Sequence, residues 1–158
     1  MKRIHLAAII FCLVITNAFA QDGKKFSLPE KFEHQRDAAN DIKQTIQLAK
    51  ESGKRILLDV GGEWCIWCHR LDAFIEANKE LKDLIDKNFI WLKINFSKEN
   101  KNEAVLSKYP EAAGYPHFFV LESDGKFLHS QNTGELEEDK DYSKQKLISF
   151  FNEWSPKK

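Results

Sequence analysis

Two cysteines separated by two residues, Cys65 and Cys68, are the side chains of this sequence best suited to covalent chemistry. A hydrophobic run ends just before them at Gly61-Gly62, and hydrophobic residues at helical spacing follow, so a strand is predicted to give way to a helix here. The unpaired N–H groups and the dipole at a helix N-terminus stabilise a thiolate. Cysteines three positions apart also bring their sulfur atoms together across the first turn as a reducible bond. The pair therefore predicts a site of thiol–disulfide exchange.

The residues alone leave three other uses of the pair open. A purely structural disulfide would close a loop of only a few residues, which gains little entropy. A zinc site would need two more ligands, for which the sequence offers His69 and His117. The string from Cys65 to His69 also spells the attachment motif of a c-type haem, with His69 as the proximal ligand. The only methionine is Met1, so the distal ligand would have to be a histidine: His34, His117 or His129.

The first twenty residues are predicted to be a signal peptide that is cleaved. Lys2 and Arg3 precede an almost wholly apolar run, which ends before the small-residue cleavage signal Ala18-Phe19-Ala20. A membrane anchor is the alternative, but the run is shorter than the ~20 residues that a span needs. Cleavage would remove Cys12 with the leader. We therefore expect a periplasmic or otherwise extracytoplasmic protein, in a compartment where disulfides persist.

Length predicts one domain, and the charge balance gives no sign of a polyanionic partner. The 158 residues include 24 basic and 24 acidic ones, and removal of the leader leaves 22 basic against 24 acidic residues. That balance gives no indication of nucleic acid or an anionic membrane as partner. No other apolar run is long enough to span a bilayer, so no stable membrane insertion is expected after cleavage. We expect a monomer with a polar, loosely packed lead-in over 21–36, one domain over 37–154 and a short tail over 155–158.

Hydrophobic spacing and turn residues predict alternating helices and strands. Gly53 is expected to end the first helix, and a break is expected near Asn78 in the helical segment that follows the cysteines. Helices are predicted over 37–52, from the cysteines to about 85, over 102–108 and over 143–154, and strands over 55–60, 89–96, 117–121 and 127–130. This order is typical of an α/β fold in which a βαβ unit precedes a ββα unit.

With these elements in place, the chain resembles the thioredoxin family over about residues 37–154. The resemblance rests on the string Glu63-Trp64-Cys65-x-x-Cys68, which matches the family's active-site signature. Asp59 falls where the family carries a buried acid, and Lys93 where it carries the lysine beside that acid. The resemblance implies a thioredoxin-like fold, with a central four-stranded mixed sheet, or five-stranded as an alternative, flanked by helices. The long segment between Cys68 and Phe89 resembles the exported thioredoxin-like branch.

The same resemblance implies a mechanism and a set of site residues. Cys65 would attack a substrate disulfide and Cys68 would resolve the mixed disulfide, with Asp59 taking the proton of Cys68 and Lys93 tuning Asp59. Substrate binding falls to four residues: Trp64, Tyr115, Pro116 at the family's cis-proline position, and Gly134. No cofactor is implied. The expected partners are protein thiols and disulfides, together with a membrane or periplasmic redox partner.

The sequence also departs from the family pattern. Ile66-Trp67 stands between the cysteines in place of Gly-Pro, and Gly61 stands where thioredoxins usually carry an aromatic residue. These differences leave the reduction potential open, and with it the direction of the reaction. Asp59 has a plainer interpretation as a solvated strand residue, although Leu58 and Val60 flank it. A non-catalytic binding module that uses the same fold is a further alternative.

Overall fold

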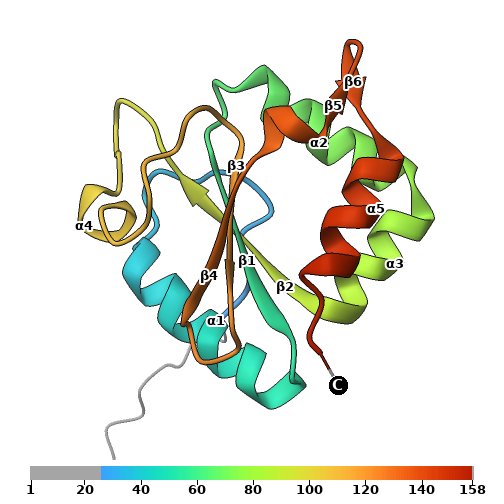
Figure 1. Ribbon diagram of the computed structural model, residues 1–158. Helices are drawn as coiled ribbons and strands as arrows, with labels where there is room; N and C mark the ends of the chain where they lie inside the picture. The colour runs from blue at the N-terminus through green and yellow to red at the C-terminus, as the bar shows by residue number, and fades with distance from the viewer. Residues whose placement is uncertain (1–25, 158) are drawn as a thin grey trace, which may run out of the picture.

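The structure is a computed structural model that describes residues 26–157 (Figure 1). The expected signal peptide and Cys12 lie outside the described residues. The elements in chain order are α1 (Ala38–Ser52), β1 (Arg55–Gly61), α2 (Ile66–Ala77), α3 (Lys79–Asn88), β2 (Phe89–Asn95), α4 (Glu103–Leu106), β3 (His117–Leu121), β4 (Phe127–Asn132), the 3-10 turn η1 (Thr133–Leu136), β5 (Glu137–Glu138), β6 (Asp141–Tyr142) and α5 (Lys144–Glu153). Within residues 26–157, every helix is too short or too polar to cross a bilayer.

Four strands form one mixed sheet in the order β2-β1-β3-β4. β1 pairs parallel with β2 and antiparallel with β3, and β3 pairs antiparallel with β4. The parallel register sets Asp59 directly opposite Lys93. The sheet is thus mixed and four-stranded as expected, and the two short strands β5 and β6 form a separate hairpin.

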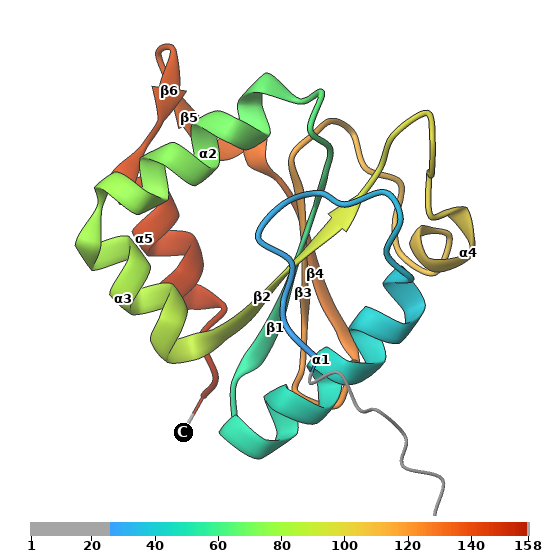
Figure 2. The same ribbon diagram turned by 180° about the vertical axis from the view of Figure 1, so that it is seen from behind.

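Helices cover both faces of the sheet, and two hydrophobic clusters fill the space between (Figures 1 and 2). Helices α2, α3 and α5 pack on one face, where Leu57 of β1 belongs to their cluster. Helices α1 and α4 pack on the other face, against Ile56, Leu58 and Val60 of the same strand. Successive residues of a strand point to opposite faces, so β1 supplies both clusters and is buried along its whole length.

Local signals set the helix ends. The side chain of Asp37 accepts hydrogen bonds from the amides of Ala39 and Asn40 and so caps α1. Gly53 ends α1 with a φ of 66°, a left-handed conformation that glycine adopts at little cost. Asn78 is extended between α2 and α3, which confirms the predicted break. Each predicted helix and strand is present, with bounds that differ by a few residues.

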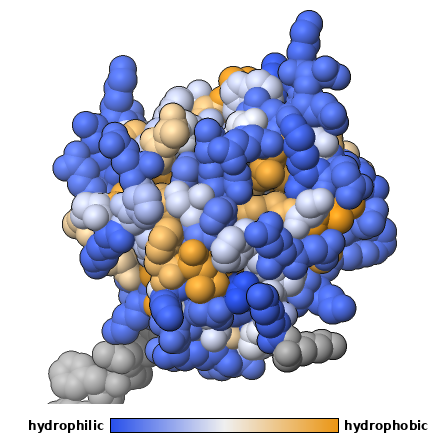
Figure 3. All heavy atoms as spheres, in the orientation of Figure 1, coloured by the Kyte–Doolittle hydropathy of each residue, from blue (hydrophilic) through white to orange (hydrophobic). Residues whose placement is uncertain are grey.

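The lead-in differs from the prediction of a loosely packed segment. Figure 2 shows it passing between α1 and α2 near the end of β1. Phe32 is only 2 % exposed and packs against the two cysteines. The backbone N–H of Phe32 donates to Glu63, and the backbone carbonyl of His34 accepts from Asn100. On the face seen in Figure 3, hydrophobic atoms appear only in small separate areas among polar side chains.

Candidate active site

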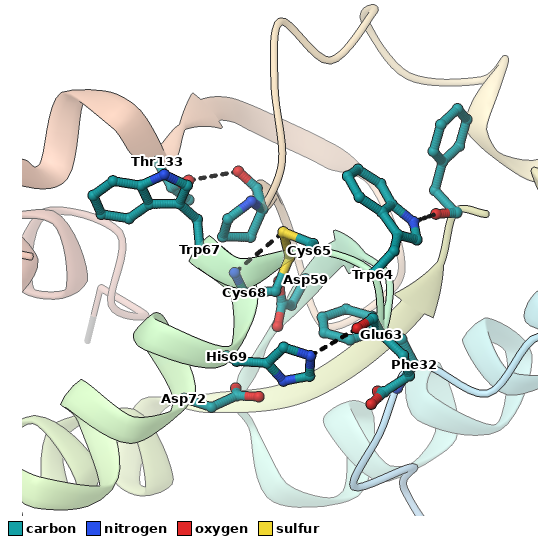
Figure 4. The surroundings of a disulfide bond; sticks show 12 residues. Phe32, Asp59, Glu63, Trp64, Cys65, Trp67, Cys68, His69, Asp72 and Thr133 are labelled. Carbon is teal, nitrogen blue, oxygen red and sulfur yellow. Dashed lines mark hydrogen bonds between the residues drawn. A yellow bond between two sulfur atoms is a disulfide. The ribbon is translucent and has the colours of Figure 1, made fainter. Parts of the chain in front are cut away.

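The two cysteines lie at the start of α2 and form a disulfide (Figure 4). Their Cα atoms are 5.3 Å apart. Cys65 is the N-cap of the helix, and its sulfur accepts a hydrogen bond of 3.1 Å from the backbone N–H of Cys68. The same N–H group, together with the helix dipole, would stabilise a thiolate on Cys65. The predicted position of the pair between strand and helix is confirmed.

Both cysteines are buried in this disulfide form. Cys65 is 4 % exposed and Cys68 is 1 % exposed. The pair at the start of α2 is therefore covered in this form, because the side chains of Trp67 and Tyr115 pack against it. Little of the surface of Cys65 is thus open to the sulfur of a substrate in this form.

Asp59 lies on β1 beneath the disulfide and is buried among charged and aromatic groups (Figure 4). Its Oδ2 accepts hydrogen bonds from Lys93 Nζ at 3.2 Å and from Trp91 Nε1 at 3.1 Å. Its other oxygen, Oδ1, has no hydrogen-bond partner among the described residues. Lys93 Nζ also donates to Asp72 Oδ1 at 2.6 Å, so one ammonium bridges two carboxylates.

Burial raises the pKa of Asp59 to about 6, against the lowering effect of Lys93. The charge of Asp72 adds to the rise. Burial lowers the pKa of Lys93, but the two carboxylates outweigh it and raise that pKa, so Lys93 stays charged. The expectation of a buried acid at Asp59 is confirmed, and its interpretation as a solvated strand residue is wrong.

The outer end of this charged network meets solvent. The side chain of Asp72 is 40 % exposed, whereas that of Lys93 is 9 % exposed. Asp72, Lys93, Trp91 and His69 line an open cavity of about 620 Å³ between the sheet and helices α2 and α3. Water can therefore approach Lys93 and Asp72 although Asp59 itself is covered.

Aromatic residues flank the disulfide on the opposite side. Trp64 is 59 % exposed, donates from its indole N–H to the carbonyl of Phe96 at 2.7 Å, and meets Tyr115 edge to face. The ring of Tyr115 stacks on Phe96. Trp64 and Phe96 also line a cavity of about 450 Å³, together with Lys98, Glu99 and Lys101. Trp64 and Tyr115 are therefore brought together beside the cysteines.

The loop before β3 completes this side of the site. The bond between Tyr115 and Pro116 is cis, as the family resemblance implied. The hydroxyl of Thr133 donates to the Pro116 carbonyl, which ties η1 to this loop. Gly134 follows Thr133, and its N–H donates to the side chain of Asn132. A Cβ atom at position 134 would lie 3.3 Å from the side-chain oxygen of Asn132.

The histidines of the zinc and haem alternatives make other contacts. His69 donates through Nε2 to the carbonyl of Glu63 at 2.9 Å. His117 is buried and hydrogen-bonded to Ser130, and burial lowers its pKa to about 4. Across residues 26–157, no three His, Cys, Asp or Glu side chains are grouped as metal ligands would be.

Two residues of the site escape sequence reasoning. Asp72 accepts a hydrogen bond from Lys93. It could have been predicted from its position one helical turn after Cys68, on the same face of α2. Phe32 contacts the cysteines. The one indication of this in the sequence is that a phenylalanine stands within a polar segment. Neither position belongs to the motif.

Comparison with known proteins places these features in context. A family model described as thioredoxin-like matches residues 37–123. The solved structure of a disulphide isomerase from Xylella fastidiosa Temecula1 is 29% identical, with a TM-score of 0.67, and the match covers 82% of this chain and 98% of that chain. The oxidised C-terminal domain of DsbD from Neisseria meningitidis is 23% identical, with a TM-score of 0.55, and covers 75% of this chain and 96% of that one, a likeness of fold.

Two curated relatives match a similar part of the chain. The disulfide bond reductase DsbH of Chlamydia pneumoniae is 23% identical over 94 residues, which cover 54% of this chain and 56% of that protein. The thiol:disulfide interchange protein DsbD of Pseudoalteromonas atlantica is 20% identical over 87 residues, which cover 55% of this chain and 14% of that protein. The chain thus spans little more than half of one relative and a small part of the other.

Proposed function

The chain belongs to the thioredoxin-like family, and from this premise we propose that it is a thiol–disulfide oxidoreductase that exchanges disulfides with other proteins through Cys65 and Cys68. One observation carries the proposal above the others. The cysteine pair caps a helix directly above a buried carboxyl group whose pKa lies near neutrality. A structural disulfide has no use for such a group, whereas proton transfer to and from a thiol does.

The first step is attack by Cys65. Its thiolate, stabilised at the start of α2, attacks one sulfur of a substrate disulfide, and the other substrate sulfur leaves as a thiolate. The product is a mixed disulfide between Cys65 and the substrate. Cys68 is the more deeply buried of the two and is the resolving thiol.

The second step needs a base. Cys68 must lose its proton before it attacks the sulfur of Cys65 in the mixed disulfide and releases the second substrate thiolate. Asp59 lies beneath the pair, and its pKa of about 6 makes it a competent base near pH 7. Lys93 tunes Asp59 by favouring the carboxylate. The substrate leaves with two thiols, and the protein keeps the disulfide.

Substrate docks on the side of Trp64, Tyr115, Pro116 and Gly134. The carbonyl of Pro116 is engaged by Thr133, so an extended substrate segment pairs with the backbone of Tyr115. The exposed indole of Trp64 supplies hydrophobic contact area next to Cys65. Gly134 carries no side chain that would obstruct the approaching chain.

The setting of the reaction is outside the cytoplasm. The predicted signal peptide over residues 1–20 supports export, and protein dithiols or a periplasmic or membrane redox partner would restore the starting state of the pair. The mature chain would act as a monomer on protein thiols and disulfides, without nucleic acid and without insertion into the membrane. Fractionation of expressing cells, with mass determination of the mature N-terminus, tests export.

Reduction of insulin by dithiothreitol tests the activity. The wild-type protein should accelerate it, and Cys65→Ser and Cys68→Ser should each abolish the acceleration. Asp59→Asn should slow the resolution step by ~10²–10⁴-fold at neutral pH and should affect the attack of Cys65 less. The mixed disulfide should therefore accumulate in acid-quenched single turnovers. A wild-type protein that stays silent would favour the binding module, and a haem Soret band in the purified protein would favour the electron carrier. Measurement of the reduction potential then decides between reductase and oxidase.

A further inference from the structure

Phe32 lies in no helix or strand, yet it is among the most deeply buried residues of the site. Its side chain forms a cluster with Cys65 and Cys68. Its backbone N–H donates to the carboxylate of Glu63 at 2.9 Å, two residues before Cys65. Figure 4 shows Phe32 and Glu63 side by side below Trp64. The lead-in therefore reaches the cysteine pair itself.

The ring of Phe32 occupies the space next to Gly61. A Cβ atom at position 61 would lie 3.2 Å from two ring carbons of Phe32 and 2.5 Å from the sulfur of Cys68. Real Cβ atoms do not approach other atoms as closely as the second distance, because their van der Waals spheres would overlap. Position 61 is where an aromatic residue was expected from the resemblance. Here a phenylalanine 29 positions earlier in the chain fills the space beside Cys68.

The same ring also contacts the charged network. The ammonium of Lys93 lies 4.4 Å from the centroid of the Phe32 ring, within the range of a cation–π interaction. That ammonium donates to both Asp59 and Asp72. The ring of Phe32 thus packs beside Cys68 and also contacts Lys93, the ion-pair partner of Asp59.

Hydrogen bonds of His34 and Arg36 hold the segment around Phe32 in place. The carbonyl of His34 accepts from Asn100 at 2.9 Å. Arg36 forms a two-point ion pair with Asp41 of α1, at 2.6 and 2.9 Å, and also donates to the carbonyl of Ser27. The lead-in is therefore fastened to α1 and to the loop after β2 by residues that closely follow Phe32.

We propose that Phe32 is a positioning residue of the dithiol site, whose ring closes Cys68 off from solvent and holds the Lys93 ammonium between Asp59 and Asp72. The effect of Phe32 on turnover rests on the proposed function. A covered Cys68 leaves Cys65 as the sulfur that a substrate meets, and a fixed Lys93 keeps the acid in a constant electrostatic setting. Both parts of the proposal can be measured without turnover.

The first measurement is the accessibility of Cys68 in the reduced full-length protein. Iodoacetamide labelling with peptide mapping by mass spectrometry follows Cys12, Cys65 and Cys68 separately. Phe32→Ala should raise the labelling rate of Cys68 by about tenfold or more, because the cover is lost. Phe32→Leu keeps an apolar cover and should stay within about twofold of wild type. Phe26→Ala is the matched control, because Phe26 lies in the same segment against Arg36.

The second measurement isolates the ring face on Lys93. Leucine fills much of the space but offers no π face, so the Phe32→Leu variant should hold Lys93 less firmly against Asp59. Lys93 lowers the pKa of Asp59, so the midpoint of Asp59, followed by carbon-13 NMR of its carboxyl carbon in the oxidised protein, should move up by about half a pH unit. The titratable or charged groups that face Asp59 are Lys93, Asp72 and Tyr142, and the adjoining cavity adds Glu30, His69, Glu76, Lys82 and Asp86. None of these groups is altered in the variant.

Equal labelling of Cys68 in Phe32→Ala and Phe26→Ala would overturn the covering role. An unchanged Asp59 midpoint in Phe32→Leu would overturn the role toward Lys93. If Phe32→Ala does not fold by circular dichroism, the shorter side chain of Phe32→Val takes its place in the labelling, and unchanged labelling of Cys68 in that variant would overturn the covering role. If the wild-type protein failed to accelerate insulin reduction, the proposed function would be contradicted. The labelling and the NMR titration would still report on Phe32.

Discussion

At the scale of single residues, the site is organised by one carboxyl group that the fold keeps from water. The folded protein holds the pKa of Asp59 at about 6 against an ordinary value of 3.8. The folded state thus binds this proton more tightly than the unfolded chain does. Stability falls as the pH rises from about 4 to about 6, where the unfolded chain is already ionised and the folded protein is losing its proton. Ionised Asp59 is therefore a cost to the fold.

Asp59→Asn should relieve that cost. Asparagine keeps the shape without the charge, so the free energy of unfolding should rise by up to about 3 kcal/mol at pH 7.5. At pH 4 and below, where Asp59 is protonated in the folded protein, the variant should be close to wild type. Urea denaturation of the oxidised proteins at both pH values measures this. The same gain at both pH values would show that the charge is not its source.

Asp72→Asn should lower the pKa of Asp59 below its wild-type value of about 6. The charge of Asp72 raises that pKa, and its removal also leaves the Lys93 ammonium to Asp59 alone. Carbon-13 NMR titration of the Asp59 carboxyl carbon gives the midpoint. Glu76→Gln is the matched control, since Glu76 borders the same cavity on the same helix but pairs with Lys82. An equal shift in both variants would assign the effect to general charge.

At the scale of helices and strands, neighbouring residues in the sequence determine where elements end, whereas contacts between distant residues determine which loop residues are buried. Gly53 and Asn78 mark helix ends because their neighbours in sequence determine the caps. Asp59 could be predicted as buried because hydrophobic residues flank it in a strand. Phe32 could not, since its burial depends on Glu63 and on the cysteines, about thirty positions away. The hairpin of β5 and β6 has two residues in each strand, too few for a periodic pattern.

Asp37→Ala should destabilise the fold by about 1 kcal/mol, because the amides of Ala39 and Asn40 lose their acceptor at the start of α1. Asp37→Asn keeps a capping oxygen and should cost only a few tenths of that amount. Thermal and urea unfolding of the two variants measure the difference. The two unfolding curves would coincide if the cap contributed nothing.

At the scale of the whole molecule, α5 completes the hydrophobic cluster that it shares with α2 and α3. Phe151 is fully buried, and its ring meets those of Phe89, Trp91 and Phe118. Trp91 in turn donates to Asp59. The last helix of the chain thus supports the strand that carries the partners of the buried acid.

Phe151→Ala should lower the free energy of unfolding by about 3–5 kcal/mol, the usual cost of a large cavity in a core. Phe127→Ala is the matched control, because Phe127 is 38 % exposed and its truncation opens no closed cavity. Urea denaturation gives both values. Similar losses in the two variants would mean that α5 is not part of the cooperative core.

The two-residue period of β1 has a consequence for how this chain can change. Ile56, Leu58 and Val60 fill the cluster under α1, while Leu57 and Asp59 point to the opposite face. Deleting one residue from the strand would turn the carboxyl group into the cluster of α1 and bring an aliphatic side chain beneath the cysteines. The deletion would therefore destabilise the hydrophobic core and remove the proposed base from the cysteine pair. A substitution in β1 changes one side chain, whereas a change in the length of the strand moves the following side chains to the opposite face.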